Sequence, residues 1–168
     1  MDAQDIILGS RVAHVRELKA EVERLKGENA RLRAENASLL SHFDLALLAA
    51  EDLRTLPEGG RLVIVDGWNL ILGADRKARN REELVAWAKA RLAERPQDLV
   101  WIVLDGPKPG VSFDGRVRVS YTGGTGQHRA DRFVCDFVRM AAFRAEASKI
   151  EVVTNDKGFL GEVRRLQG

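Results

Sequence analysis

The chain has 168 residues, 45% hydrophobic and 31% charged, which suits one globular domain with an extended appendage. It contains no apolar run of the roughly 20 residues that a membrane span requires, and its first residues lack the basic start and apolar core of a signal peptide. We therefore expect a soluble, cytoplasmic protein without a membrane partner. Because Cys135 is the only cysteine, an internal disulfide, a redox pair and a zinc cluster are excluded.

The formal net charge is only +2, but the two parts of the chain differ in charge. Residues 1–60 contain 8 Lys and Arg against 11 Asp and Glu, whereas residues 61–168 contain 19 against 14. If the aspartates discussed below are neutralised by a metal, the second part is left with a still more basic surface. This charge balance favours a polyanionic partner over an acidic small molecule.

The first segment carries a heptad repeat. Leucine recurs at every seventh residue, at Leu18, Leu25, Leu32 and Leu39. The other core positions of the heptads hold Val15, Val22, Asn29, Asn36 and Phe43. Valine and leucine in this alternation favour two parallel strands, and buried asparagine fixes their register and number. We expect a leucine-zipper coiled coil over residues 1–56 that forms a parallel homodimer; the alternative is a single amphipathic helix lying on its own globular domain.

Charged residues beside the heptad core agree with a paired zipper. Glu21 would face Lys26 of the other chain, and Glu28 would face Arg33. The dense basic helix that precedes the heptads of zipper transcription factors is missing, so we interpret the zipper as a dimerisation or docking device. The linker is predicted at residues 57–60, Pro-Glu-Gly-Gly.

After the linker, apolar strands alternate with helices over residues 61–168. Strands are predicted at residues 61–66, 99–105, 117–121 and 150–156, and helices at 81–95, 130–147 and 158–166. This alternation indicates an α/β fold whose mainly parallel sheet is covered on both faces. Sheets of this kind bind ligands at the carboxyl ends of their strands.

Four aspartates are expected at that edge of the sheet. Asp66, Asp105 and Asp156 end the first, second and fourth predicted strands, and Asp131 opens the long helix after the third. Two carboxylates about 4 Å apart repel by roughly 4 kcal/mol at an effective dielectric constant near 20, so such a cluster calls for a cation. Sets of carboxylate ligands suit Mg²⁺ or Mn²⁺. The sequence therefore predicts a magnesium or manganese site.

Structural roles explain several of these residues as well. Asp105 is equally well interpreted as a turn former, and Asp131 as the cap of the helix that it opens. Asn69 either shapes a turn or holds the Asp66 carboxylate by a hydrogen bond. The glycine-rich loop at residues 123–126 lacks the lysine and hydroxyl residue of a P-loop, which disfavours a nucleotide-binding enzyme. We interpret that loop as a flexible lip of the cleft.

The motifs VDGWN, VLDG, RAD and VVTNDKGFLGEVRRL, in this order, resemble the YacP-like branch of the NYN superfamily, a relative of the PIN-domain nucleases. The resemblance covers residues 61–168. It implies a PIN-like, three-layer α/β/α fold and metal-dependent endoribonuclease activity on RNA. By motif match it also implies that the acidic site residues are Asp66, Asp131 and Asp156. Asn69 would be the orienting residue, and Asp105 would be a further acid.

The resemblance implies hydrolysis of RNA in which metal held by the first three aspartates activates water and stabilises charge on the phosphate. His128, Arg129 and Lys157 flank the expected site, where they are either phosphate-binding groups or solvated surface charges. Trp68 is interpreted either as a stacking platform for an unpaired base or as a packing residue at the core or rim.

The chain departs from the family pattern in three places. His128 and Arg129 stand where YacP-like proteins carry an acid before the Ala-Asp pair. Gly158 stands where the second acid of the S-x-D-x-D-F motif is expected, and the chain ends before the family's fifth strand. These departures leave open whether the site holds one metal or two. They also leave open an alternative function, a catalytically impaired dimeric protein that binds RNA or acts as a scaffold. A ribosome or another RNA–protein complex is a candidate partner.

Overall fold

The computed structural model describes the backbone of residues 3–73, 75–124 and 128–168, with the side chains of residues 3–11 and 34–42 left out of the description. The elements follow one another in this order: α1 (Ala3–Arg54), β1 (Leu62–Asp66), α2 (Gly67–Leu72), α3 (Arg81–Glu94), β2 (Leu99–Leu104), β3 (Gly110–Asp114), β4 (Val117–Tyr121), α4 (Arg129–Phe143), the 3-10 turn η1 (Ala147–Lys149), β5 (Ile150–Val153) and α5 (Lys157–Gln167). The chain divides into two compact units, Met1–Ala37 and Ser38–Gly168.

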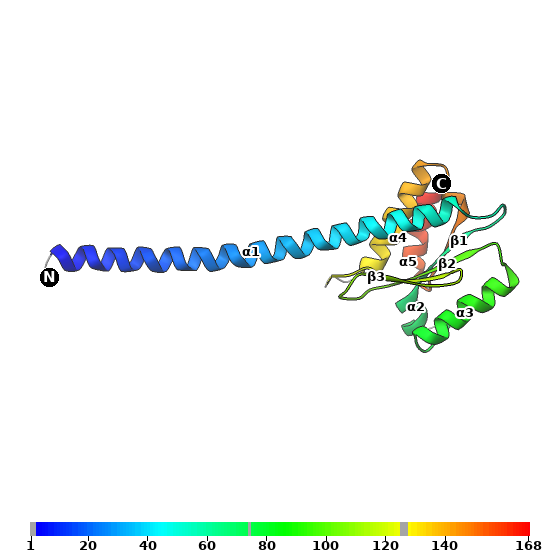
Figure 1. The fold of residues 1–168 in the computed structure, drawn as a ribbon, viewed down its shortest axis with the longest axis horizontal. Coiled ribbons are helices and arrows are strands. Elements are labelled where there is room, and N and C mark those ends of the chain that lie inside the picture. Colours follow the sequence, from blue (N-terminus) through cyan, green and yellow to red (C-terminus); the bar gives the residue numbers. More distant parts are fainter. Residues whose placement is uncertain (1–2, 74, 125–127) are drawn as a thin grey trace. The chain divides into compact units, whose positions relative to one another are not determined.

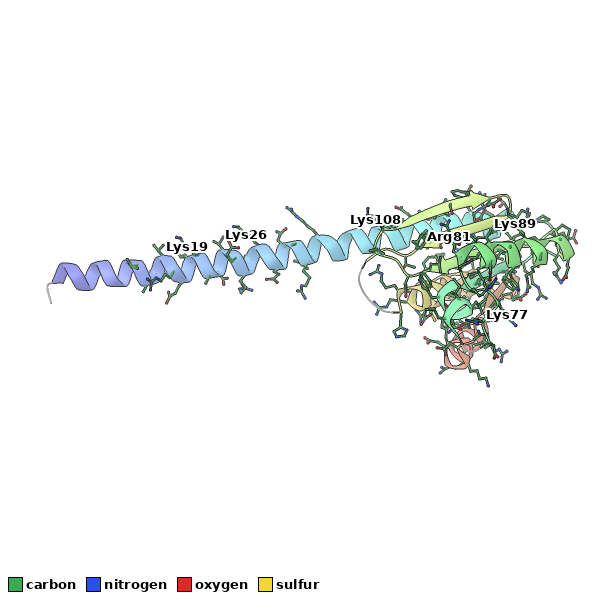
Figure 2. All side chains as sticks on the ribbon, turned by 90° about the horizontal axis from the view of Figure 1, so that it is seen from below. Lys19, Lys26, Lys77, Arg81, Lys89 and Lys108 are labelled. Atoms are coloured by element: carbon green, nitrogen blue, oxygen red, sulfur yellow. The ribbon has the colours of Figure 1, made fainter. Side chains whose placement is uncertain are left out.

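The first unit is a single stretch of α1. Lys19 and Lys26, one heptad apart, lie on the same side of the helix (Figure 2). The apolar side chains at its described heptad positions are 47–51% exposed: Val15, Leu18, Val22, Leu25 and Leu32. Two further heptad positions, Asn36 and Leu39, fall outside the described side chains. The predicted helix is therefore confirmed, and it leaves a row of apolar side chains uncovered in the single chain.

The second unit is built on a five-stranded sheet with the strand order β3-β4-β2-β1-β5 (Figure 1). Three of its pairings are parallel, and only β3 pairs antiparallel, with β4. β1 lies between β2 and β5, with Leu62 opposite Leu99 on one side and Ile150 on the other. The predicted α/β fold with a mainly parallel sheet is confirmed.

Helices cover both faces of this sheet because successive strand residues point to opposite sides. Val63 and Val65 of β1 pack in a core with residues of α2 and α3. Leu62 and Ile64 pack in a second core, with residues of α4, α5 and the end of α1. This double burial explains why β1 up to Val65 and the whole of β2 are apolar rather than alternating in polarity.

Three elements were not predicted: the short 3-10 turn η1, the helix α2 and the strand β3. The helix α2 follows β1 without a break, so its apolar residues appear in the sequence as a continuation of the strand. The strand β3 is short and mostly exposed, and it therefore lacks the buried apolar pattern by which the other strands were recognised. Among the described residues, no helix is long and apolar enough to cross a membrane.

The last turns of α1 belong to the second unit. Leu45, Ala49 and Leu53 are almost completely buried in the core that includes α4 and α5. Asp52, on the same part of α1, accepts a hydrogen bond of 2.6 Å from the indole nitrogen of Trp101 and forms an ion pair of 3.2 Å with Arg118. The boundary predicted at residues 57–60 therefore lies inside the second unit.

We expect Asp52→Ala to lower the free energy of unfolding by about 3 kcal/mol, because it leaves the buried Trp101 and partly buried Arg118 donors without this acceptor. Urea denaturation followed by circular dichroism measures this loss. Asp44→Ala, an exposed position on the same helix, is the matched control and should change stability by less than about 0.5 kcal/mol. Equal stability of the two variants would refute the anchoring role of Asp52.

Candidate active site

The four predicted aspartates line one cleft at the carboxyl edge of the sheet. The cleft has a volume of about 350 Å³. Its lining comes from β1, α2, the segments after β2 and β5, and the start of α4: Asp66, Trp68, Asn69, Leu72, Gly73, Asp105, His128, Ala130, Asp131 and Asp156. Parallel pairing brings these segments together because the carboxyl ends of parallel strands meet at one edge.

Asp66 is both the last residue of β1 and the N-cap of α2. Its Oδ1 accepts a hydrogen bond of 3.3 Å from the backbone N–H of Asn69. Gly67 lets α2 begin directly against the sheet, because a Cβ at this position would lie 2.4 Å from Leu104 Cδ2. This close packing leaves Asp66 only 7% exposed. The sharp turn from strand to helix therefore buries the carboxylate at the floor of the cleft.

Thr154 connects Asp66 and Asp156 by hydrogen bonds. Its hydroxyl donates a hydrogen bond of 3.0 Å to Asp66 Oδ2 and accepts one of 3.1 Å from the backbone N–H of Asp156. Sequence reasoning missed this residue, although its place directly after the apolar β5, at the ligand-binding edge, was a usable signal. Thr154 thus fixes the orientation of one carboxylate and the backbone of the other.

Asn69 contacts Asp66 through its backbone, not through its side chain. Its side-chain oxygen accepts a hydrogen bond of 2.7 Å from the backbone N–H of Asn155. The side chain of Asn155 in turn donates to the carbonyl oxygen of Asp75, at 3.0 Å. Asn69 therefore holds the segment that leads to Asp156, and it ties that segment to the connection between α2 and α3.

Asp156 lies three residues beyond β5 rather than at its end, and it is the N-cap of α5. Its side chain accepts a hydrogen bond of 2.9 Å from the backbone N–H of Phe159. A Cβ on Gly158 would lie 3.2 Å from Asp156 Oδ1. An acidic residue at position 158 would thus begin beside the Asp156 carboxylate, where this chain has no side chain.

Asp105 holds neighbouring elements together as well as lining the cleft. Its Oδ1 accepts hydrogen bonds from the backbone N–H of Ala130 at 2.7 Å and from the Thr122 hydroxyl at 3.1 Å. Its carbonyl oxygen accepts a hydrogen bond of 2.8 Å from the indole nitrogen of Trp68. Asp105 therefore fixes the start of α4 and the edge of the Trp68 ring.

Asp131 lies in the first turn of α4, and its Oδ2 is 3.2 Å from His128 Nδ1. The N-cap of α4 is His128, which has φ 57° and makes no side-chain capping bond. The alternative in which Asp131 caps this helix is therefore wrong, because Asp131 is already inside it. His128 is exposed and orients the Asp131 carboxylate from the mouth of the cleft.

The two remaining predicted RNA-binding residues lie beside the cleft rather than in its lining. Arg129 opens α4, and its guanidinium group packs against Gly124, where an added Cβ would lie 2.5 Å from Arg129 Nη1. Lys157 is exposed in the first turn of α5, next to Asp156. Residues 125–127, which include part of the loop interpreted as a lip, fall outside the described residues.

Burial raises the pKa of Asp66 to about 6. Desolvation is the largest cause, and the negative charges of Asp131 and Asp105 add to it. The hydrogen bonds from Thr154 and from the backbone of Asn69 act in the opposite direction. The charged form of Asp66 is thus destabilised in the folded chain, and a positive charge in the cleft would relieve that cost.

The donor chemistry of the cleft fits a hard divalent cation, because its four acidic residues offer only oxygen ligands. Within the described part of the chain, however, no three His, Cys, Asp or Glu side chains stand close enough together to hold a metal ion. A cation would therefore have to draw the carboxylates together by rotation of their side chains.

Comparisons of the chain with protein-family models, with curated proteins and with solved structures find no match.

We expect Asp66→Asn to stabilise the metal-free chain at neutral pH. The raised pKa means that the folded chain binds the Asp66 proton more tightly than the unfolded chain, so stability falls as pH rises from about 4 to about 6. The charged carboxylate then costs about 3 kcal/mol at pH 7, a cost that asparagine removes.

Melting temperatures in EDTA, measured from pH 4 to pH 8, check this prediction. The advantage of Asp66→Asn should be largest above pH 6 and vanish toward pH 4. Asp136→Asn, on an exposed face of α4, is the control and should show no such dependence. A wild type that is the more stable protein at pH 7 would contradict the destabilised state of Asp66.

Proposed function

We propose that this chain is a metal-dependent endoribonuclease that hydrolyses phosphodiester bonds of RNA. One observation carries the proposal: four motifs that are far apart in the sequence contribute aspartates to one cleft. VDGWN supplies Asp66, VLDG supplies Asp105, RAD supplies Asp131 and VVTND supplies Asp156. These are the motifs that resemble YacP-like NYN domains, and a mainly parallel sheet with helices on both faces agrees with their PIN-like fold.

In this proposal Asp66, Asp131 and Asp156 hold Mg²⁺ or Mn²⁺, which activates water and stabilises negative charge on the phosphate. The chain's own groups set the geometry. Thr154 orients the Asp66 carboxylate, and His128 orients that of Asp131. The hydrogen bonds of the Asp156 backbone and side chain hold the start of α5 beside Asp66 and Asp131.

Cations around the cleft suit the RNA backbone. Arg129 and Lys157 open the two helices that carry Asp131 and Asp156. Arg76 and Lys77 are exposed in the connection between α2 and α3, which Asn155 ties to the cleft, and Lys77 is visible there in Figure 2. Such groups position a nucleic acid through its phosphates without reading its sequence.

A catalytically impaired RNA-binding or scaffold protein is the second candidate function. Two observations favour it: Gly158 replaces an acid beside Asp156, and the described side chains include no preformed group of three metal ligands. A metal titration separates the two candidates. Stabilisation of the wild type by Mn²⁺, lost in Asp66→Asn, supports the nuclease, because a ligand stabilises the fold that binds it. RNA binding that is unaffected by Mn²⁺ and by Asp66→Asn supports the second candidate.

We also propose that the first unit pairs with a second copy of this chain as a parallel coiled coil. The half-exposed valine and leucine side chains follow the heptad pattern, and Asn29 lies at a core position. Within one chain, Glu21 and Lys26 form exposed ion pairs with Arg24 and Glu23. Such exposed pairs contribute little stability, so they do not compete with burial of the apolar row.

Cleavage of end-labelled single-stranded RNA in Mg²⁺ or Mn²⁺ tests the proposed activity. We expect Asp131→Asn to reduce the cleavage rate at least a hundredfold, because it removes a charged ligand of the metal. Asp136→Asn places the same change further along α4 on an exposed surface and should cleave like the wild type. Cleavage that survives in EDTA, or that the two variants support equally, would rule out the proposed site.

Light scattering tests the coiled coil. The wild type should have twice the chain mass of 18.7 kDa at micromolar concentration. Leu25→Asp should give the monomer, because it places a charge in the apolar core of the zipper. Ala20→Asp introduces the same charge at an outer heptad position and should remain dimeric. A monomeric wild type would refute the pairing.

A further inference from the structure

Two apolar side chains remain exposed at the acidic cleft. Trp68 is 40% exposed and Leu72 is 77% exposed, and both line the cleft. They are four residues apart on α2, so they lie on the same face of the helix. The described chain buries Trp101 almost completely and packs Trp87 against the core. Trp68 and Leu72 therefore form an apolar surface of the cleft that the described fold leaves open to a ligand.

The ring of Trp68 is held in place by its hydrogen bond to the Asp105 carbonyl oxygen. The absence of a side chain at the neighbouring Gly67 allows α2 to pack close to Leu104 of β2. An aromatic ring that is already fixed loses little conformational freedom when a ligand stacks on it. The two cleft residues thus form a preorganised apolar ledge, defined by Trp68 and Leu72.

The ledge lies within one helical turn of the proposed reaction centre, because Trp68 follows Asp66 by two residues. The cleft volume of about 350 Å³ is at the small end of ligand sites, which run from about 300 to 1,000 Å³. A planar heteroaromatic group attached to a phosphate matches an apolar ledge beside cations and carboxylates. In duplex RNA the faces of the bases are stacked on one another and are not accessible.

We propose that the ledge receives one unpaired nucleobase next to the phosphate that is cut. The proposal rests on the ribonuclease function proposed above. Stacking accepts every base because each has a π-face, so the ledge selects for an unpaired strand and not for a sequence.

Tryptophan fluorescence of the full chain tests the ledge without altering it. Trp87→Phe removes one background signal, and the remaining background, Trp101, is buried. A short single-stranded RNA, with and without Mg²⁺, should quench the emission and protect Trp68 from acrylamide. The same RNA annealed to its complement should do neither.

Substitution provides the second test. Trp68→Ala should weaken binding of the single strand by about 5- to 150-fold, and Trp68→Phe should restore most of it. Leu72→Ala should cause a smaller loss. Phe143→Ala is the matched control, because Phe143 is 94% exposed at the far end of α4, about 20 Å along the helix from the cleft. It should bind like the wild type.

The outcomes separate the ledge from the nuclease. If RNA is cleaved in a metal-dependent way but Trp68→Ala binds it as tightly as the wild type, the ledge is overturned and the proposed nuclease function stands. Equal binding of single strand and duplex has the same meaning. A wild type that neither binds nor cleaves RNA overturns both. Quenching by the single strand alone, together with a loss in Trp68→Ala that Phe restores, establishes the ledge.

Discussion

The burial of Asp66 is the constraint on which the rest of the cleft depends. β1 is paired on both sides, and helices cover both of its faces, so the residue that ends it has little access to water. A carboxylate in that position needs donors and, when charged, a cation. Thr154 and the backbone of Asn69 supply the donors. The negative charges of the nearby Asp131 and Asp105 make the charged form of Asp66 more costly.

The same aspartates hold the fold together. Asp66 caps α2, Asp156 caps α5, and Asp105 accepts from the start of α4. Each capping hydrogen bond to a carboxylate oxygen fixes the backbone that carries the same aspartate. The other oxygen of that carboxylate therefore lies at a defined place. A structural role is therefore no argument against a chemical one at these positions. It explains how short turns after strands hold several like charges near one another.

Helix α1 serves two different environments along its length. Its heptad side chains up to Leu32 are half exposed, which suits a partner helix. From Leu45 onward its apolar side chains are buried in the second unit, and Asp52 accepts from Trp101 and Arg118. A heptad pattern indicates which residues are apolar but not what covers them. For this reason the heptad pattern does not show that the last turns of α1 pack within the second unit.

The sequence by itself determined the class of fold and the edge at which the aspartates gather. The continuous apolar runs of β1 and β2 require burial on both faces, and burial of this kind implies parallel strands whose carboxyl ends share an edge. Only the tertiary structure decided which residues form hydrogen bonds with these site residues. Thr154 and Asn155 reach Asp66 and Asn69 across more than eighty residues of sequence. The exposure of Trp68 likewise depends on how α2 packs against the sheet, because burial is set by neighbours that are distant in sequence and that local periodicity does not encode.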